Sequence, residues 1–76
     1  MKELVEVIAK ALVDNPDQVC VTEKEDSRSI VIELKVASQD MGKVIGKGGR
    51  RAQAIRSIMK AKYLRDGRRV IVDIVG

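Results

Sequence analysis

Histidine is absent from the 76-residue sequence, and cysteine occurs once, as Cys20. The commonest metal ligand and the usual acid–base group near neutral pH are therefore both missing. A single cysteine excludes an intramolecular disulfide and any zinc site with several cysteine ligands. We therefore expect no metal, no other cofactor and a reducing compartment, the cytoplasm.

Long apolar runs are also lacking, since no segment approaches the roughly 20 residues that a membrane-spanning helix needs. Glu3 and Glu6 lie where a signal peptide has an uninterrupted hydrophobic stretch. With 45% hydrophobic and 34% charged residues, the sequence has the composition of one small folded domain over residues 1–76. A domain of this size buries only about 60% of its unfolded surface, which favours a binding surface over the deep cleft of an enzyme.

Charge is unevenly distributed along the sequence. Residues 1–37 carry five basic and eight acidic side chains, whereas residues 38–69 carry ten basic and two acidic ones. Such asymmetry is typical of a positively charged face that binds phosphate groups. A helix that presents basic side chains only to solvent gives the same pattern, and charge alone does not distinguish the two.

Hydrophobic periodicity predicts six elements in the order helix, strand, strand, helix, helix, strand. Their approximate ranges are 2–14, 19–22, 30–37, 39–45, 50–62 and 70–75. The first two strands should form an antiparallel hairpin, and a right-handed crossover through two helices makes the second and third strands parallel neighbours. The predicted fold class is α+β, with a three-stranded mixed sheet whose helices pack on one face.

Four local features accompany this order. Ser38 is a suitable N-cap for the second helix, and Asp40 would complement the dipole of its first turn. Tyr63 should pack against the core with its hydroxyl in water. Helix 50–62 should bury four apolar side chains, Ala52, Ile55, Ile58 and Met59. Three arginines around the last turn should be solvated, Arg65, Arg68 and Arg69.

Three glycines separate the second and third helices, in the segment Gly46-Lys47-Gly48-Gly49. The spacing fits neither a Walker loop nor a dinucleotide-binding loop, because Lys47 and Arg51 stand where those motifs need glycine. Small residues here would let a sugar-phosphate strand approach the main chain, while the next helix offers unpaired N–H groups. Lys47, Arg50 and Arg51 add positive charge. A helix–helix turn selected only for its geometry is the alternative.

The segment Met41-Gly42-Lys43-Val44-Ile45-Gly46-Lys47-Gly48-Gly49-Arg50, followed by Ala54-Ile55-Arg56, resembles the V-I-G-x-x-G core of KH domains. The order of elements is similar to the type II KH arrangement, and the whole chain resembles the small stand-alone KH proteins of the bacterial KhpA family. In that family both variable loop positions are often polar or basic, whereas the second one here is Gly48.

This resemblance implies that about four nucleotides of single-stranded RNA or DNA bind in a groove between the helices that flank the loop and the central strand. Carried over by position, the loop clamps the phosphates and three apolar side chains form the groove floor. Helical spacing alone also predicts that two of these, Ile45 and Ile55, are simply core residues. The predicted RNA-binding residues are Lys43, Val44, Ile45, Gly46, Lys47, Gly48, Gly49, Arg50, Arg51 and Ile55.

Aromatic side chains are scarce, since Phe and Trp are absent and Tyr63 is the only Tyr. The stacking surfaces of RRM, OB-fold and cold-shock modules therefore cannot be built, whereas a KH groove holds bases on aliphatic side chains.

Partners are also implied by the resemblance. They are a second copy of the chain and a larger KH-containing protein, with a role as RNA chaperone or post-transcriptional regulator that affects cell elongation. Because one groove for four nucleotides gives little affinity, linking two grooves in a homodimer would increase it. The candidate dimer surfaces are the last strand and the outer part of helix 50–62, with Arg51, Ala54, Ser57, Ile58 and Met59. The alternative function is an adaptor that pairs with another KH protein and binds RNA only secondarily.

Overall fold

The computed structural model describes residues 2–76, which form three α-helices and one three-stranded sheet. The helices are α1 (Lys2–Leu12), α2 (Met41–Ile45) and α3 (Arg50–Lys62), and the strands are β1 (Cys20–Glu25), β2 (Ser29–Lys35) and β3 (Arg69–Val75). Short 3-10 turns occupy Pro16–Gln18, Ser38–Asp40, Lys47–Gly49 and Leu64–Asp66. The predicted order of helices and strands is confirmed.

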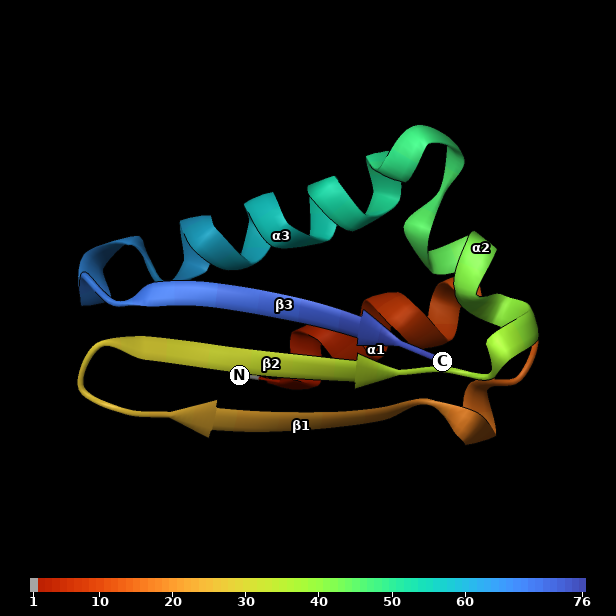
Figure 1. Cartoon of the computed structure of the whole chain (residues 1–76), viewed down its shortest axis with the longest axis horizontal. Helices are drawn as coiled ribbons and strands as arrows, with labels where there is room; N and C mark the ends of the chain where they lie inside the picture. The colour runs from red at the N-terminus through yellow and green to blue at the C-terminus, as the bar shows by residue number, and fades with distance from the viewer. Residues whose placement is uncertain (1) are drawn as a thin grey trace.

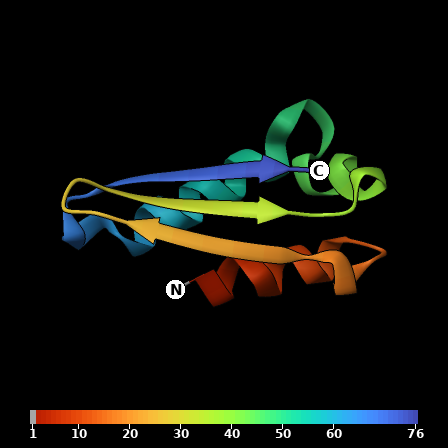
Figure 2. The same ribbon diagram turned by 60° about the horizontal axis from the view of Figure 1, so that its bottom comes forward.

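The sheet has the strand order β1-β2-β3, so β2 is central (Figure 1). β1 and β2 are antiparallel, with Val21 opposite Leu34, whereas β2 and β3 are parallel, with Ile32 opposite Val72. The helices pack on one face, α1 against β1 and α3 against β3 (Figure 2). This is the predicted mixed sheet with one covered face.

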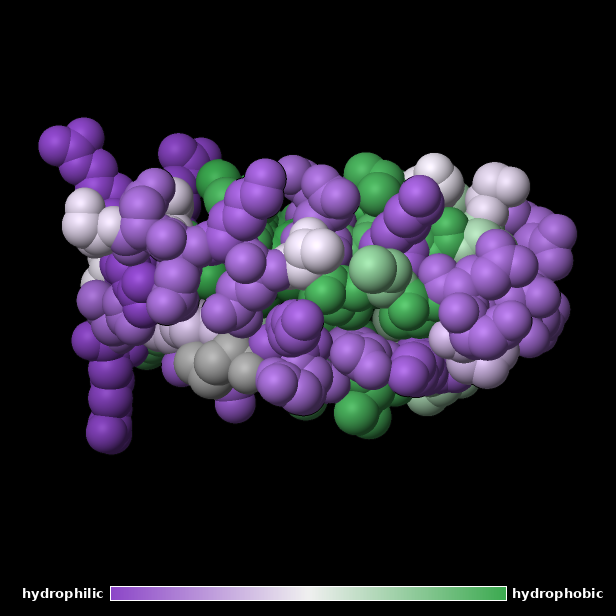
Figure 3. All heavy atoms as spheres, turned by 90° about the horizontal axis from the view of Figure 1, so that it is seen from below, coloured by the Kyte–Doolittle hydropathy of each residue, from purple (hydrophilic) through white to green (hydrophobic). Residues whose placement is uncertain are grey.

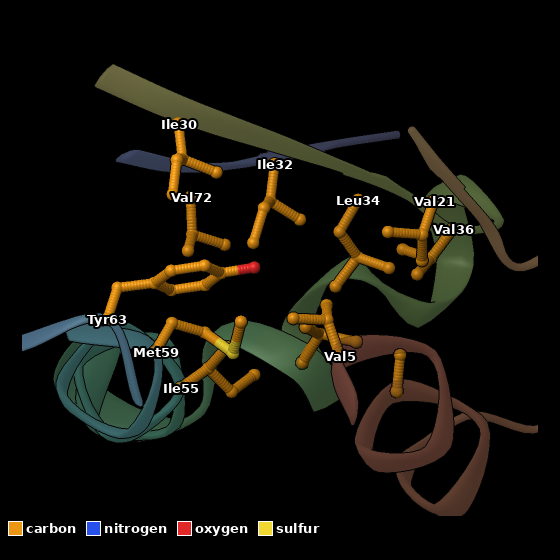
Figure 4. Packing of buried hydrophobic residues seen from close by; sticks show 12 residues of the cluster. Val5, Val21, Ile30, Ile32, Leu34, Val36, Ile55, Met59, Tyr63 and Val72 are labelled. Carbon is orange, nitrogen blue, oxygen red and sulfur yellow. The ribbon is translucent and has the colours of Figure 1, made fainter. Parts of the chain in front are cut away.

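Alternating side chains of β2 form the centre of the core, because every second residue of a strand points to the same face. Ile30, Ile32 and Leu34 are fully buried. Around them pack Val5, Ala9, Val21, Val44, Ile55, Met59, Tyr63 and Val72, most of which are shown in Figure 4. Burial of one such aliphatic side chain stabilises the fold by roughly 1.5–3 kcal/mol, so this layer holds α1 and α3 on the sheet.

Two burial predictions for the third helix are wrong. Ile58 is 45% exposed, because it lies about 100° around the helix from the buried stripe that ends at Met59 and Tyr63. The hydroxyl of Tyr63 is buried and has no hydrogen-bond partner among the described residues. Figure 4 shows the reason: the tyrosine ring lies lengthwise under the sheet, with its hydroxyl directed inward.

The predicted capping of the second helix is also wrong. Ser38 begins a 3-10 turn, and no side chain caps α2. Asp40 is only 1% exposed, and its carboxylate faces the end of α1. There it accepts hydrogen bonds from the N–H of Asp14 at 3.3 Å and from the N–H and Nδ2 of Asn15, both at 3.1 Å. Asp40 therefore ties the end of α1 to the start of α2.

Apolar side chains are also exposed at the edge formed by α1 and β1 (Figure 3). Val7 of α1 is 66% exposed, and Leu4 and Ile8 beside it are half-buried. Within residues 2–76, no helix combines the length and the hydrophobicity needed to span a bilayer.

Candidate nucleic-acid interface

The loop between α2 and α3 needs glycine at three of its four positions. Gly46, Gly48 and Gly49 have φ angles of 77°, 64° and 75°, a region that residues with a Cβ rarely adopt. The N–H of Gly46 donates to the carbonyl of Gly42 at 2.9 Å, which ends α2. The N–H of Gly49 donates to the carbonyl of Gly46 at 3.1 Å and closes the turn. The loop projects at the end of the molecule opposite the β1–β2 hairpin (Figure 1).

The glycines of this loop differ in their surroundings. A Cβ added at Gly46 would lie 2.7 Å from Cγ of Arg51, so this glycine is required by packing as well as by its φ angle. A Cβ added at Gly48 or Gly49 would meet nothing within 4 Å. The main chain at these two positions is therefore bare of side chains, and a phosphate group can approach it closely.

Two of the predicted basic side chains are free, and two are engaged. Lys47 and Arg50 are exposed, and their side chains make no ion pair or hydrogen bond within residues 2–76. The ammonium of Lys43 instead pairs with the carboxylate of Asp14, and Nη1 of Arg51 donates to the carbonyl of Lys43 at 2.7 Å. Lys43 thus ties α2 to the segment that follows α1, and Arg51 ties the start of α3 back to α2.

The start of α3 adds a further attraction for phosphate. Gly49 is the N-cap residue of this helix, and no side chain caps it. The positive end of the helix dipole therefore lies beside the bare main chain of the loop, which is a favourable place for an anion.

The three apolar site residues are placed differently from one another. Val44 is fully buried and Ile55 is 2% exposed, so both belong to the core beneath α2 and α3. Ile45 is half-exposed and is the one of the three that reaches the surface beside the loop. Core packing, the alternative interpretation from helical spacing, is correct for Ile55 and only partly correct for Ile45.

A concave groove lies between α3 and the edge strand β3. The groove implied by the family resemblance was expected at a different place, against the central strand β2. The groove beside β3 has a volume of about 550 Å³, and its basic lining residues are Arg56, Lys60, Arg68 and Arg69. The helical spacing of Arg56 and Lys60, four positions apart, is the sequence signal that could have revealed one wall of it. No group of three or more metal-ligating side chains within residues 2–76 is placed to hold an ion.

The chain is similar to a known protein family along nearly its whole length. The family model described as "KhpA/KhpB, KH domain" matches residues 2–74. The chain belongs to this KH-domain family. The KhpA/KhpB family is non-enzymatic, which agrees with the prediction from the sequence.

Relatives in the KhpA/KhpB family cover the chain almost completely. The protein named "RNA-binding protein KhpA" from Caldanaerobacter subterraneus subsp. tengcongensis is 64% identical over 75 residues, 99% of this chain and 100% of the relative. Proteins of the same name from Clostridium acetobutylicum and Listeria monocytogenes are 56% and 40% identical over 75 residues, 99% of this chain and 100% and 99% of the relatives. No solved structure matches the chain.

The three arginines near the last turn were predicted to be solvated, and for Arg68 this prediction is wrong. Its guanidinium is bonded to the Asp66 carboxylate, lies 3.6 Å from Glu25 and donates to the carbonyl of Asp26 at 3.2 Å. The hydrogen bond with Arg68 lowers the pKa of Asp66 and raises the pKa of Arg68. Arg65 and Arg69 are exposed, as predicted. Arg68 therefore joins the β1–β2 hairpin to the start of β3.

Proposed function

We propose that this chain binds single-stranded RNA, without catalysing a reaction, through a phosphate clamp at residues 46–49. One observation carries the proposal: the bare main chain of Gly48 and Gly49 lies between two unpaired cations, Lys47 and Arg50. The name of the relatives in the KhpA/KhpB family, RNA-binding protein KhpA, supports RNA as the ligand. The KH loop clamps about four nucleotides.

The other predicted site residues have supporting roles in this proposal. Lys43 and Arg51 hold the loop in position, since their charged groups are already bonded to Asp14 and to the end of α2. Ile45 offers an aliphatic surface to a base, whereas Val44 and Ile55 support α2 and α3 from the core.

The test is a double substitution, Lys47→Asp with Gly48→Asp. It places two negative charges beside the phosphates, and aspartate tolerates the left-handed conformation of Gly48 better than most residues. We expect a native circular-dichroism spectrum and the loss of RNA binding in a fluorescence-anisotropy titration at moderate salt. The matched control is Lys24→Asp with Ser27→Asp, which changes the charge equally at exposed positions of β1 and its hairpin.

Wild-type RNA affinity in the folded loop variant would overturn the clamp, and the basic stretch 56–69 would become the leading candidate. If the double variant unfolds, Lys47→Ala alone gives the same comparison, because this exposed side chain makes no contact that the fold needs.

The cellular part of the proposal rests on the family resemblance. We propose that residues 1–76 form one KH unit that acts in the cytoplasm as an RNA chaperone or post-transcriptional regulator affecting cell elongation. The exposed, unpaired thiol of Cys20 is compatible with a reducing compartment.

A second candidate function is pairing with another KH unit, either a second copy of this chain or a larger KH-containing protein. The observation that favours it is the exposed apolar flank of α3 formed by Ala54, Ile58 and Ala61. Met59, which the sequence placed on this surface, is fully buried and contributes nothing to it. Pairing would link two RNA sites and raise the affinity without any new RNA contact.

A further inference from the structure

We propose that Asp40 and Asn15 are positioning residues for RNA binding. Their hydrogen bonds join the end of α1 to the start of α2, and this link keeps α2 and the loop that follows it in the geometry that a phosphate needs. The proposal rests on the clamp proposed above, and it adds two residues that act on the clamp without touching RNA.

The first argument is the way in which the carboxylate of Asp40 is buried. It is 1% exposed, and the nearest ammonium, that of Lys43, lies 4.0 Å away. A buried carboxylate is costly unless its oxygens accept hydrogen bonds. Those that it accepts within residues 2–76 come from Asp14 and Asn15 at the end of α1, and none comes from its own helix. Asp40 therefore fixes the start of α2 on the end of α1.

The second argument is the weakness of α2 by itself. It has five residues, whereas isolated helices shorter than about 12–15 residues are hardly stable in water. No side chain caps it, and Val44 is its one buried side chain. α3, on the other side of the loop, has 13 residues and buries three side chains. The loop thus has one firm support and one weak support, and the link between Asp40 and Asn15 strengthens the weak one.

The third argument is the short distance between the link and the loop. Gly46 follows Asp40 by six residues, which is about 9 Å along a helix. A rotation of α2 by about 10° around Asp40 would therefore move Gly46 by about 1.5 Å. A binding site has to be held within about 0.5 Å of its productive geometry. The loop keeps its shape beside Arg51 and the carbonyl of Lys43 only while the start of α2 stays in place.

The test uses the variant Asn15→Ala, which removes the Nδ2 donor to Asp40 without a change of charge. Its matched control is Ile30→Val, a fully buried residue that pairs with Glu25 beside the β1–β2 hairpin, at the other end of the molecule from the loop. Both variants should lower Tm by several degrees. A link that only stabilises the fold predicts that both also bind RNA equally well.

The RNA is an oligouridylate of about four nucleotides, the length that a KH loop clamps. We expect Asn15→Ala to bind it about tenfold more weakly, because the fraction of molecules with a correctly placed loop falls in that proportion when a hydrogen bond to a charged group is lost. Ile30→Val should bind as the wild type does.

The salt dependence separates positioning from direct contact. Lys47→Ala removes a phosphate contact and should lower the slope of log K against log salt by about 0.7. Asn15→Ala should leave this slope unchanged, because the molecules that bind still make every phosphate contact. A lower slope for Asn15→Ala would overturn the positioning role, since it would assign Asn15 to the RNA contact itself.

A measurement on the wild type needs no variant to fold. Because coupling is reciprocal, RNA that requires the held loop must in turn make opening of the link rarer. In NMR hydrogen exchange, the N–H of Asn15 should exchange about tenfold more slowly at saturating RNA, the same factor as the loss of affinity. The N–H of Asp26, bonded to Ser29 in the hairpin, should not change. Unchanged exchange at Asn15, or equal affinities of Asn15→Ala and Ile30→Val, would overturn the proposal.

Failure of the clamp itself has a different signature. In that case the variant Lys47→Asp/Gly48→Asp retains wild-type affinity for the RNA. If only the positioning role fails, that variant loses RNA binding while Asn15→Ala binds RNA as the wild type does.

Discussion

Substitution of single glycines by alanine in and beside the loop tests the geometry of the clamp. Gly46 has φ 77° and ψ 171°, a combination that is almost exclusive to glycine. Gly48 has φ 64° and ψ 20°, in the left-handed helical region that other residues enter at a lower cost. Gly42 lies inside α2 without a positive φ angle, and a Cβ there would meet nothing within 4 Å.

The expected changes in the free energy of unfolding follow from these differences. For Gly46→Ala, backbone strain costs about 1–3 kcal/mol. The added Cβ, 2.7 Å from Cγ of Arg51, also displaces this side chain and breaks its hydrogen bond to Lys43, for about 1 kcal/mol more. Gly48→Ala costs about 1–2 kcal/mol. Gly42→Ala stabilises by roughly 0.5–1 kcal/mol, because alanine is favoured over glycine inside a helix.

Thermal unfolding followed by circular dichroism measures all three variants. A domain of this size has a total stability of about 4–11 kcal/mol, and 1 kcal/mol shifts Tm by about 4–8 °C. We expect Tm to increase slightly in Gly42→Ala, to fall by about 4–16 °C in Gly48→Ala and to fall furthest in Gly46→Ala. Equal Tm values for Gly46→Ala and Gly48→Ala would refute the contact between the loop and Arg51.

Three further predictions concern single side chains. Tyr63→Phe should raise Tm by several degrees, because it removes a buried hydroxyl without a partner at a gain of about 1 kcal/mol; a lower Tm would contradict this. Burial alone would raise the pKa of Asp40, but the hydrogen bonds from Asn15 and Asp14 and the charge of Lys43 outweigh it, so the pKa is lowered. The stability that Asp40 provides is therefore present above its unfolded pKa of about 3.9 and is lost as the pH falls through the lower folded value. In urea unfolding, Asp40→Asn should lower the urea concentration at the midpoint of unfolding at pH 7. It should also make this midpoint depend less on pH below pH 4. Substitution of the exposed Asp17 by Asn should change neither quantity. Ile58→Asp should convert a dimer into a monomer in analytical ultracentrifugation at tens of micromolar, with Val7→Asp as the exposed apolar control; a monomeric wild type would rule out homodimer pairing.

The order of the elements could be predicted from the sequence because it depends on local periodicity and on the handedness of one crossover. Ile30, Ile32 and Leu34 alternate along β2 and are all buried, as the pattern requires. Asp40 could not be placed in this way. Its hydrogen-bond partners, Asp14 and Asn15, are 26 and 25 residues away, and only the packing of α1 beside α2 brings them together.

The candidate site could be predicted from the sequence only in part, because some of its features are local and others depend on tertiary packing. The spacing of the glycines predicts where the loop lies and that its backbone adopts positive φ angles. Gly46 and Gly48 have such angles. The state of each cation is decided by tertiary contacts: Lys43 pairs with Asp14, while Lys47 remains free. The sequence predicts that β3 is an edge strand, but it does not show which side chains of α3 and β3 line a groove there, because that depends on how the two elements pack.

One helix, α3, connects the core, the proposed RNA clamp and the candidate pairing surface, and its geometry explains how they coexist. Successive residues are about 100° apart around the helix axis, so 13 residues present several separate flanks. Met59 faces the sheet, Lys60 faces the groove, and Ile58 lies on the opposite side from Lys60. Pairing through Ile58 would therefore leave the loop of each copy open to RNA. Two short footprints joined in this way would bind one longer strand more tightly than either could alone, which gives a chain of 76 residues a route to useful affinity.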